Sequence, residues 1–196
     1  TNSKSSLVFG TSTGKVYCYD LETLQEYWVN TNSKEMIKSK PVYVDNKILY
    51  TSRDGFLYCL DARTGLMIWR WKEKADTDLS DSHIIYDDRR VYIVSNDGNL
   101  YGINLLLGRM EWKSERHKLF QNIGLSSDSR STYGITRNNI FVIFNNTNGR
   151  IEKEIKLNER QRLSTAPPFD DSGLIYYAND GNINFIDNKN TVQKVL

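Results

Sequence analysis

Short apolar runs and polar turns alternate along the whole chain. Five of the runs end at a turn and read "LVFGTS", "ILYTSR", "VYIVSN", "STYGIT" and "LIYYAN". No apolar period of 3.6 residues, which would indicate an amphipathic helix, persists over any stretch. The pattern therefore predicts short β-strands joined by tight turns and almost no helix.

The runs and turns recur with a period of 41 to 43 residues. The repeated turn position is occupied in order by Gly14, Gly55, Gly98, Asn139 and Gly181. The clearest copies of the repeat read "DGFLYCLDARTGLMIW" and "DGNLYGINLLLGRMEW", and each ends in a tryptophan. A fixed period of this length is typical of repeat architectures. We divide the chain into repeats at about residues 5–40, 41–82, 83–124, 125–165 and 166–196.

One repeat contains four short strands and three hairpins. The Asp-Gly pairs in the repeat predict type I′ turns, because positive φ is readily adopted by glycine. Asn138-Asn139 fits the same role in the fourth repeat. An earlier hairpin of the repeat is marked by Asp45, by the doublets Asp87-Asp88 and Asp170-Asp171, and by Asp128.

Four short strands at this period predict an all-β protein, a β-propeller of four-stranded antiparallel blades. A single blade cannot bury both of its faces, whereas blades stacked at about 10 Å can. We expect one propeller domain, or a fragment of one, over residues 1–196. Leu7 begins what should be the second strand of the first blade, so we expect five blades less one strand. A longer parent of about seven or eight blades is the favoured context, with a small closed ring as the alternative.

The motif "DGxLYxLDxxTGxxxW" resembles the pyrroloquinoline-quinone-type propeller repeat. This is the repeat of quinoprotein dehydrogenases and of BamB-like outer-membrane assembly lipoproteins, and the resemblance covers nearly the whole chain. It implies that Trp28, Trp69 and Trp112 dock between neighbouring blades, with looser packing at Lys153, which replaces the fourth tryptophan. It also implies that Asp20, Asp61 and Asn104 cap the next turn with their side chains. The repeat motif comprises Gly14, Trp28, Asp54, Gly55, Asp61, Gly65, Trp69, Asp97, Gly98, Gly108, Trp112, Gly149, Asp180 and Gly181, and the first repeat has Leu24 in place of the second glycine.

The sequence contains no constellation for a cofactor, a metal or catalysis. A working quinoprotein would add adjacent cysteines, a tryptophan that stacks on the quinone, and a calcium site beside a catalytic Asp, and none of these can be placed here. We therefore expect no cofactor and no enzymatic activity. The acidic doublets are interpreted as turn residues, and His83 and His117 lack partners at metal-ligand spacing. Asn145-Asn146-Thr147 is a glycosylation sequon of the kind that also arises by chance.

Cys18 and Cys59 occupy the same position of neighbouring repeats. Facing sheets lie about 10 Å apart, whereas a disulfide needs Cα atoms about 4.4–6.8 Å apart. Both are therefore expected to be buried free thiols.

Composition and charge restrict the possible partners. The net charge of +2 and the lack of a basic stripe give no support for nucleic-acid binding, and no apolar run is long enough for a membrane span. We expect a non-catalytic scaffold that binds a protein or a polysaccharide, with self-association through bare blade faces as a further possibility. The resemblance implies an extracytoplasmic setting, in the periplasm or at the cell surface. An accessory propeller of a longer enzyme and a sensor domain are the alternatives.

Overall fold

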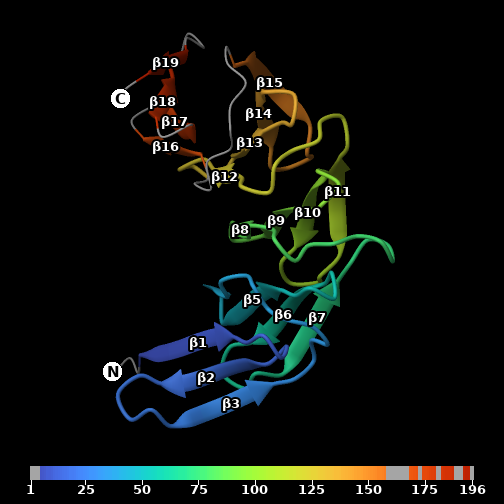
Figure 1. Ribbon diagram of the computed structural model, residues 1–196, viewed down its shortest axis with the longest axis vertical. Helices are drawn as coiled ribbons and strands as arrows, with labels where there is room; N and C mark the ends of the chain where they lie inside the picture. Colours follow the sequence, from blue (N-terminus) through green and yellow to red (C-terminus); the bar gives the residue numbers. More distant parts are fainter. Residues whose placement is uncertain (1–4, 158–167, 172–173, 180–181, 188–191, 195–196) are drawn as a thin grey trace. The chain divides into compact units, whose positions relative to one another are not determined.

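The computed structural model describes residues 5–157, 168–171, 174–179, 182–187 and 192–194. Within these residues the chain is entirely β-structure, with 19 strands and no helix (Figure 1). All strand pairs are antiparallel and join strands that are consecutive in the sequence. The predicted fold class is confirmed, because the strands form a series of small antiparallel sheets that match propeller blades. The chain divides into two compact units, described separately below: unit 1 is Thr1–Ile84 with Leu105–Arg109, and unit 2 is Ile85–Asn104 with Met110–Leu196.

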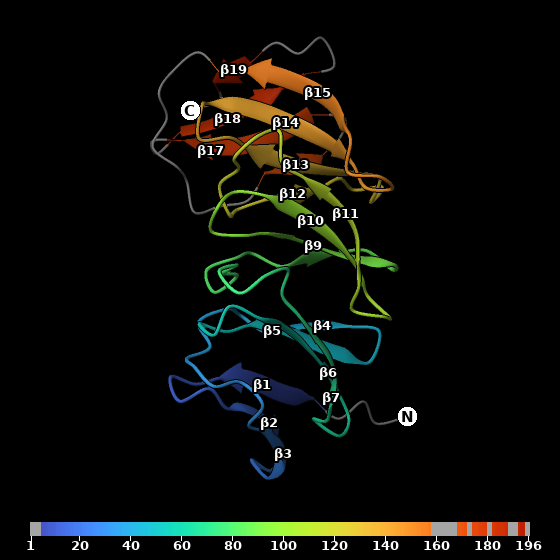
Figure 2. The same cartoon turned by 90° about the vertical axis from the view of Figure 1, so that its right-hand side faces the viewer.

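Unit 1 contains a three-stranded and a four-stranded sheet. The first sheet is β1 (Ser6–Gly10), β2 (Val16–Asp20) and β3 (Glu26–Asn30), and the second is β4 (Val42–Val44), β5 (Lys47–Thr51), β6 (Leu57–Asp61) and β7 (Met67–Trp71). The sheets stack face to face in both views (Figures 1 and 2). Their shared core includes Trp28 from β3 and the stacked rings of Tyr50 and Tyr58, whose centroids are 4.9 Å apart.

Unit 2 contains three four-stranded sheets. Their strands are β8 (Ile85–Tyr86), β9 (Arg90–Val94), β10 (Leu100–Asn104) and β11 (Met110–Ser114); β12 (Gly124–Leu125), β13 (Ser131–Ile135), β14 (Ile140–Asn145) and β15 (Ile151–Lys156); and β16 (Phe169–Asp171), β17 (Leu174–Asn179), β18 (Asn182–Ile186) and β19 (Val192–Lys194). One core packs β9 and β10 against β14 through Tyr92, Leu100 and Phe144. A second core packs β14 against β17 through Phe141 and Tyr177.

The first sheet has one strand fewer than the others, as the position of Leu7 predicted. Leu7 lies in β1 and pairs with Tyr19 of β2. The predicted boundary between residues 124 and 125 falls within β12 (Gly124–Leu125). A single domain over residues 1–196 stays a prediction.

Two predicted local features are wrong. Asp54-Gly55 and Asp97-Gly98 do not form type I′ turns, because Gly55 and Gly98 have φ of +84° whereas Asp54 and Asp97 have no positive φ. The turn instead closes through the bond from Gly55 N to Ser52 O (2.9 Å), so the left-handed glycine follows an ordinary β-turn, as in three-residue hairpin loops. The positive φ of both Asp45 and Asn46 (+44° and +57°) places the type I′ geometry at that earlier hairpin.

The doublet Asp170-Asp171 was expected in a turn but lies in strand β16. The strand includes Asp171 because this residue pairs with Leu174 of β17, and residues 172–173 lie outside the described residues. Trp71 is the last residue of β7 and pairs with Leu57.

Candidate binding site

The three motif tryptophans make the same pair of contacts. Each Nε1 donates to a backbone carbonyl of the following sheet's third hairpin turn: Trp28 to Ala62 O (3.0 Å), Trp69 to Leu105 O (3.1 Å) and Trp112 to Asn146 O (3.0 Å). Each ring also covers a glycine of that turn. A Cβ added to Gly65, Gly108 or Gly149 would lie 2.5, 2.5 or 2.3 Å from the indole. These glycines have positive φ as well, so both the backbone conformation and the packing exclude a side chain there.

The motif acids lie in turns and bind nearby donors. The carboxylate of Asp54 accepts the hydroxyl of Tyr58 (2.6 Å) and the Phe56 amide (3.2 Å). Asp61 Oδ1 accepts the amides of Arg63 and Thr64, and hydrogen bonds from Thr64 hold its pKa below the usual range. Burial acts to raise the pKa of Asp97, but hydrogen bonds from Ser95 and from the Asn99 amide lower it overall. Gly14 has φ of +79°, and Asp180 and Gly181 lie outside the described residues.

The expected cap at Asp20 is present. Asp20 Oδ1 accepts the amides of Glu22 and Thr23 (both 2.9 Å), and Oδ2 accepts the hydroxyl of Tyr27. These bonds, led by the one from Tyr27, lower the pKa of Asp20 to about 2, and the same contact raises the pKa of Tyr27 to about 12. The Asn104 amide donates to Glu111 Oε1 (2.7 Å).

Both cysteines are buried and free, as expected. Burial raises the pKa of Cys59 to about 12, so its thiol is protonated at neutral pH. His117 Nε2 lies 3.2 Å from Glu154 Oε1, an ion-pair distance when the imidazole is protonated. Among the described residues, no three His, Cys, Asp or Glu side chains cluster in a way that could hold a metal ion.

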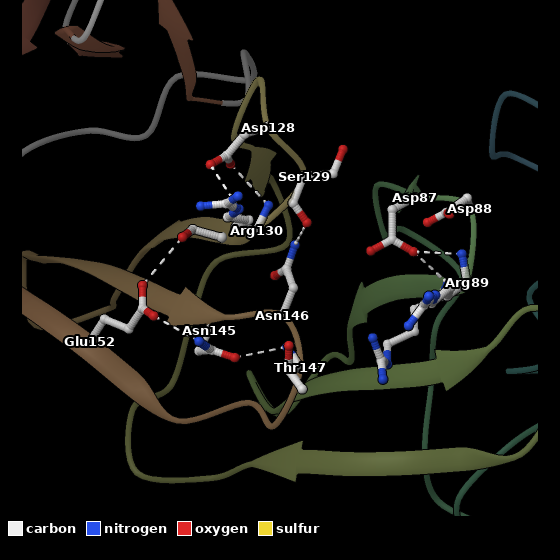
Figure 3. Close-up of a pocket in the computed structure, with 12 residues that line it drawn as sticks. Asp87, Asp88, Arg89, Asp128, Ser129, Arg130, Asn145, Asn146, Thr147 and Glu152 are labelled. Carbon is white, nitrogen blue, oxygen red and sulfur yellow. Dashed lines mark hydrogen bonds and ion pairs between the residues drawn. The ribbon is translucent and has the colours of Figure 1, made fainter.

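Unit 2 contains an open polar pocket with a volume of about 500 Å³ (Figure 3). It is formed by the β8–β9 turn, the β12–β13 turn and the β14–β15 turn with the start of β15. Twelve residues line it: Asp87, Asp88, Arg89, Arg90, Asp128, Ser129, Arg130, Ser131, Asn145, Asn146, Thr147 and Glu152. None of them is aliphatic or aromatic, so the pocket offers charges of both signs and both hydrogen-bond donors and acceptors.

The β8–β9 turn forms one wall through Asp87. Its Oδ1 accepts the amides of Arg89 (2.8 Å) and Arg90 (2.7 Å), and its Oδ2 accepts the hydroxyl of Tyr92. Burial and this contact raise the pKa of Tyr92. The Arg90 guanidinium pairs with Glu111. The Asp87 carboxylate thus acts as a turn cap.

Asn146 forms the floor of the pocket, and its side chain is buried. Its Oδ1 accepts Thr132 Oγ1 (2.7 Å) and its Nδ2 donates to Ser129 O (2.9 Å). Its backbone amide donates to Arg130 O (2.9 Å), and its carbonyl accepts Trp112. One residue therefore ties two turns and a tryptophan together beneath the pocket.

The pocket rim has charged groups that are available to a ligand. Within the described part of the chain, the exposed side chains of Asp88 and Arg89 have no hydrogen-bond or ion-pair partner. Arg130 makes only a long contact to Asp128 (Nε to Oδ2, 3.6 Å), and its side chain is 85% exposed. Figure 3 shows Asp88 and Arg89 on one wall and Arg130 on the other. Ser129, also on the lining, has a positive φ of +58°, which is rare without glycine.

Sequence reasoning missed this pocket because its walls come from three turns in two different repeats. A signal was nevertheless present, since three hairpins carry an acid followed two residues later by a base: Asp45 and Lys47, Asp87 and Arg89, Asp128 and Arg130. The sequon gave a second hint. Its Asn145 lines the pocket and donates to Glu152 Oε1 (2.8 Å), while its Oδ1 accepts the Thr147 amide (2.9 Å).

A comparison with protein-family models identifies the family of the chain. Residues 2–194 match the family model described as outer membrane protein assembly factor BamB. The chain belongs to the BamB family. No curated protein matches it in sequence.

Three solved structures similar to this BamB-family chain are distant from it in sequence. BamB from Moraxella catarrhalis is 18% identical with a TM-score of 0.74, and the match covers 100% of this chain and 58% of that one. The computationally designed Ika8 protein is 14% identical with a TM-score of 0.75, and the match covers 94% and 56% of the two chains. A chain of the mitotic checkpoint complex is 12% identical with a TM-score of 0.75, over 98% and 60%.

These identities establish a shared fold and nothing finer. The BamB-family chain spans 58% of the length of the Moraxella protein. Along the residues that the structure describes, no helix is long and apolar enough to cross a membrane.

Proposed function

We propose that this chain is a non-catalytic scaffold whose pocket between the β8–β9, β12–β13 and β14–β15 turns binds a polar segment of a partner protein. The observation that carries the proposal is the rim, where Asp88, Arg89 and Arg130 offer charges of both signs. Family membership supports a role as a scaffold in an extracytoplasmic setting, in the periplasm or at the cell surface.

Three of the four carboxylates that line the pocket are held by hydrogen bonds, which favours binding over catalysis. Asp87 caps its turn and binds Tyr92. Asp128 accepts Ser126 Oγ (2.7 Å) and the Arg130 amide (3.0 Å), and hydrogen bonds, led by that from Ser126, lower its pKa. Glu152 accepts Asn145 and Ser131. A general acid or base needs a proton-exchanging pair free to reach a substrate, whereas these groups are held in the hairpins.

A protein fits the pocket better than a polysaccharide. Sugar rings are commonly held against flat apolar or aromatic surfaces, and the pocket lining has neither. Arginine and carboxylate groups are present on both walls, and they suit a segment that carries both charged side chains and backbone amides. We therefore propose a protein partner, with a polysaccharide as the outcome that would replace it.

Site-specific photo-crosslinking in a native envelope extract tests the proposal. A crosslinker at Asp88 should capture one discrete protein, and Arg89→Glu with Arg130→Glu should abolish its capture. A crosslinker at exposed Asp76, in unit 1, is the control and should not capture it. The assignment would be overturned if the double variant still captured the protein. It would also be overturned if the parent chain retained a glycan that the double variant did not.

A further inference from the structure

Unit 1 exposes a group of large aliphatic side chains at two turns. They are Leu66, Met67, Ile68, Leu106 and Leu107, with exposed fractions of 69%, 40%, 46%, 68% and 57%. We refer to these five residues as the aliphatic surface. Single exposed aliphatic residues are ordinary, but a contiguous group indicates an interaction site.

The two turns meet at Trp69. Its Nε1 donates to Leu105 O (3.1 Å), and a Cβ added to Gly108 would lie 2.5 Å from its indole. Met67 and Ile68 directly precede Trp69, and Leu106 and Leu107 directly precede Gly108. All five residues therefore lie within three positions of Trp69 or Gly108, the two partners of this contact.

The repeat itself does not require aliphatic residues at these positions. Where the second repeat has Leu66-Met67-Ile68, the first has Gln25-Glu26-Tyr27 and the fourth has Arg150-Ile151-Glu152. Where the third has Leu106-Leu107, the fourth has Thr147-Asn148. The turns of the first, second and fourth repeats close with the same pair of backbone hydrogen bonds, so this turn does not need aliphatic residues to form.

The charges around the aliphatic surface are mainly positive. Residues 61–71 and 105–109 contain Arg63, Arg70 and Arg109, all exposed, and one acid, Asp61. The Asp61 carboxylate already accepts three hydrogen bonds from Arg63 and Thr64. A complementary occupant carries carboxylates beside its apolar side chains.

The backbone of β7 favours a protein strand as the occupant. β7 is the last strand of its sheet, and no strand in the described part of the chain pairs with its outer side. Its open amide and carbonyl groups can bind an added strand. Lipid tails cannot satisfy these groups, so burial of this edge in a membrane would be unfavourable.

We propose that the aliphatic surface and the outer edge of β7 bind an extended segment of a partner protein in which aliphatic residues alternate with Asp or Glu. The segment adds to the sheet beside β7 and places its aliphatic side chains on Leu66 and Ile68. Its acids lie near Arg63 and Arg109. This inference rests on the proposed function, protein binding, and adds a second surface to the pocket of unit 2.

A capped eight-residue peptide of alternating valine and glutamate tests the proposal. Titrated into the ¹⁵N-labelled chain, it should shift the amide signals of Met67–Trp71 and slow their hydrogen exchange. Leu66→Glu and Leu106→Glu should each weaken binding at least about tenfold, since they add negative charge against the acidic peptide. Gln25→Glu, at the position equivalent to Leu66, is the matched control and should bind as the parent does.

Several outcomes would overturn the proposal. One is no shift at β7, and another is peptide binding that Leu66→Glu and Leu106→Glu leave intact. A third is a chain that does not bind the peptide but binds phosphatidylglycerol vesicles through the same residues. A chain that does not bind the peptide but dimerises through these residues in sedimentation velocity would count equally against it. Arg89→Glu and Arg130→Glu should not alter peptide binding, so failure here is separable from failure of the pocket.

Discussion

The indole Nε1 of Trp112 donates a 3.0 Å hydrogen bond to the carbonyl oxygen of Asn146, which is also the floor of the polar pocket. The contact that packs β11 against the next sheet thus supports the residue that positions the pocket walls. Asn146 therefore belongs both to the packing between the two sheets and to the pocket, so a change in this packing should alter ligand binding.

Removing the donor of this bond should destabilise the chain. In Trp112→Phe the Asn146 carbonyl loses its partner in a buried setting, which costs about 1–3 kcal/mol of unfolding free energy. Urea denaturation followed by circular dichroism measures it. Tyr43→Phe, on a ring that is 58% exposed, is the control and should change stability little. A loss below about 0.5 kcal/mol in Trp112→Phe would contradict this role.

The side chain of Asn146 should contribute as much to the stability of the chain as its backbone carbonyl does. Asn146→Ala removes the bonds to Thr132 and Ser129 and leaves buried polar groups unpaired, so we expect a loss of about 1–3 kcal/mol. Partner capture through the pocket should fall as well. Asn148→Ala, two residues along the same turn, is exposed and should leave both stability and capture near the parent's values.

Leu24 adopts a conformation that suits glycine. Its φ is +57°, and its side chain is 71% exposed, so its contacts contribute little. Leu24→Gly should raise stability by about 0.5–1 kcal/mol through release of backbone strain. Gly65→Ala should do the reverse and cost more than about 1 kcal/mol, because φ is +69° and the Trp28 ring lies against the position. Equal changes in unfolding free energy for Leu24→Gly and Gly65→Ala would contradict this prediction.

The Asp20–Tyr27 pair should give a defined pH dependence. The pKa of Asp20 is lowered to about 2, so its stabilisation is present above the unfolded value of about 3.9 and is lost as the pH falls through 2. The pKa of Tyr27 is raised to about 12, so its stabilisation is present below about 10 and is lost as the pH rises through 12. Unfolding midpoints measured across both ranges should respond less steeply in Tyr27→Phe than in the parent. Identical pH profiles for Tyr27→Phe and the parent would contradict a stabilising contact between Asp20 and Tyr27.

The two thiols should be unreactive while the chain is folded. The nucleophile is the thiolate, and burial raises the pKa of Cys59 to about 12 and also raises that of Cys18. Titration with an aromatic disulfide at pH 8 should detect no rapid reaction in buffer and two thiols in denaturant. Prompt labelling of Cys59 in the native chain would show that its site opens.

The repeat was readable from the sequence because its parts are local. A turn glycine, a capping acid and a tryptophan at fixed spacing belong to single hairpins, and period alone reveals them. The turn type was misjudged because Asp54-Gly55 and Asp45-Asn46 look alike in sequence, whereas the positive φ falls on one residue in the first and two in the second. The pocket escaped prediction for a different reason: Arg89 and Arg130 are 41 residues apart, and only the stacking of two sheets makes them neighbours.

The indole bonds of Trp28, Trp69 and Trp112 span 34, 36 and 34 residues. Each therefore closes a chain loop of nearly the same length, and the entropy of loop closure is nearly the same for all three. None depends on a contact between distant ends of the polypeptide. When the chain emerges one repeat after another, each junction can thus form as soon as the last hairpin of the next sheet is released, without waiting for the rest of the chain.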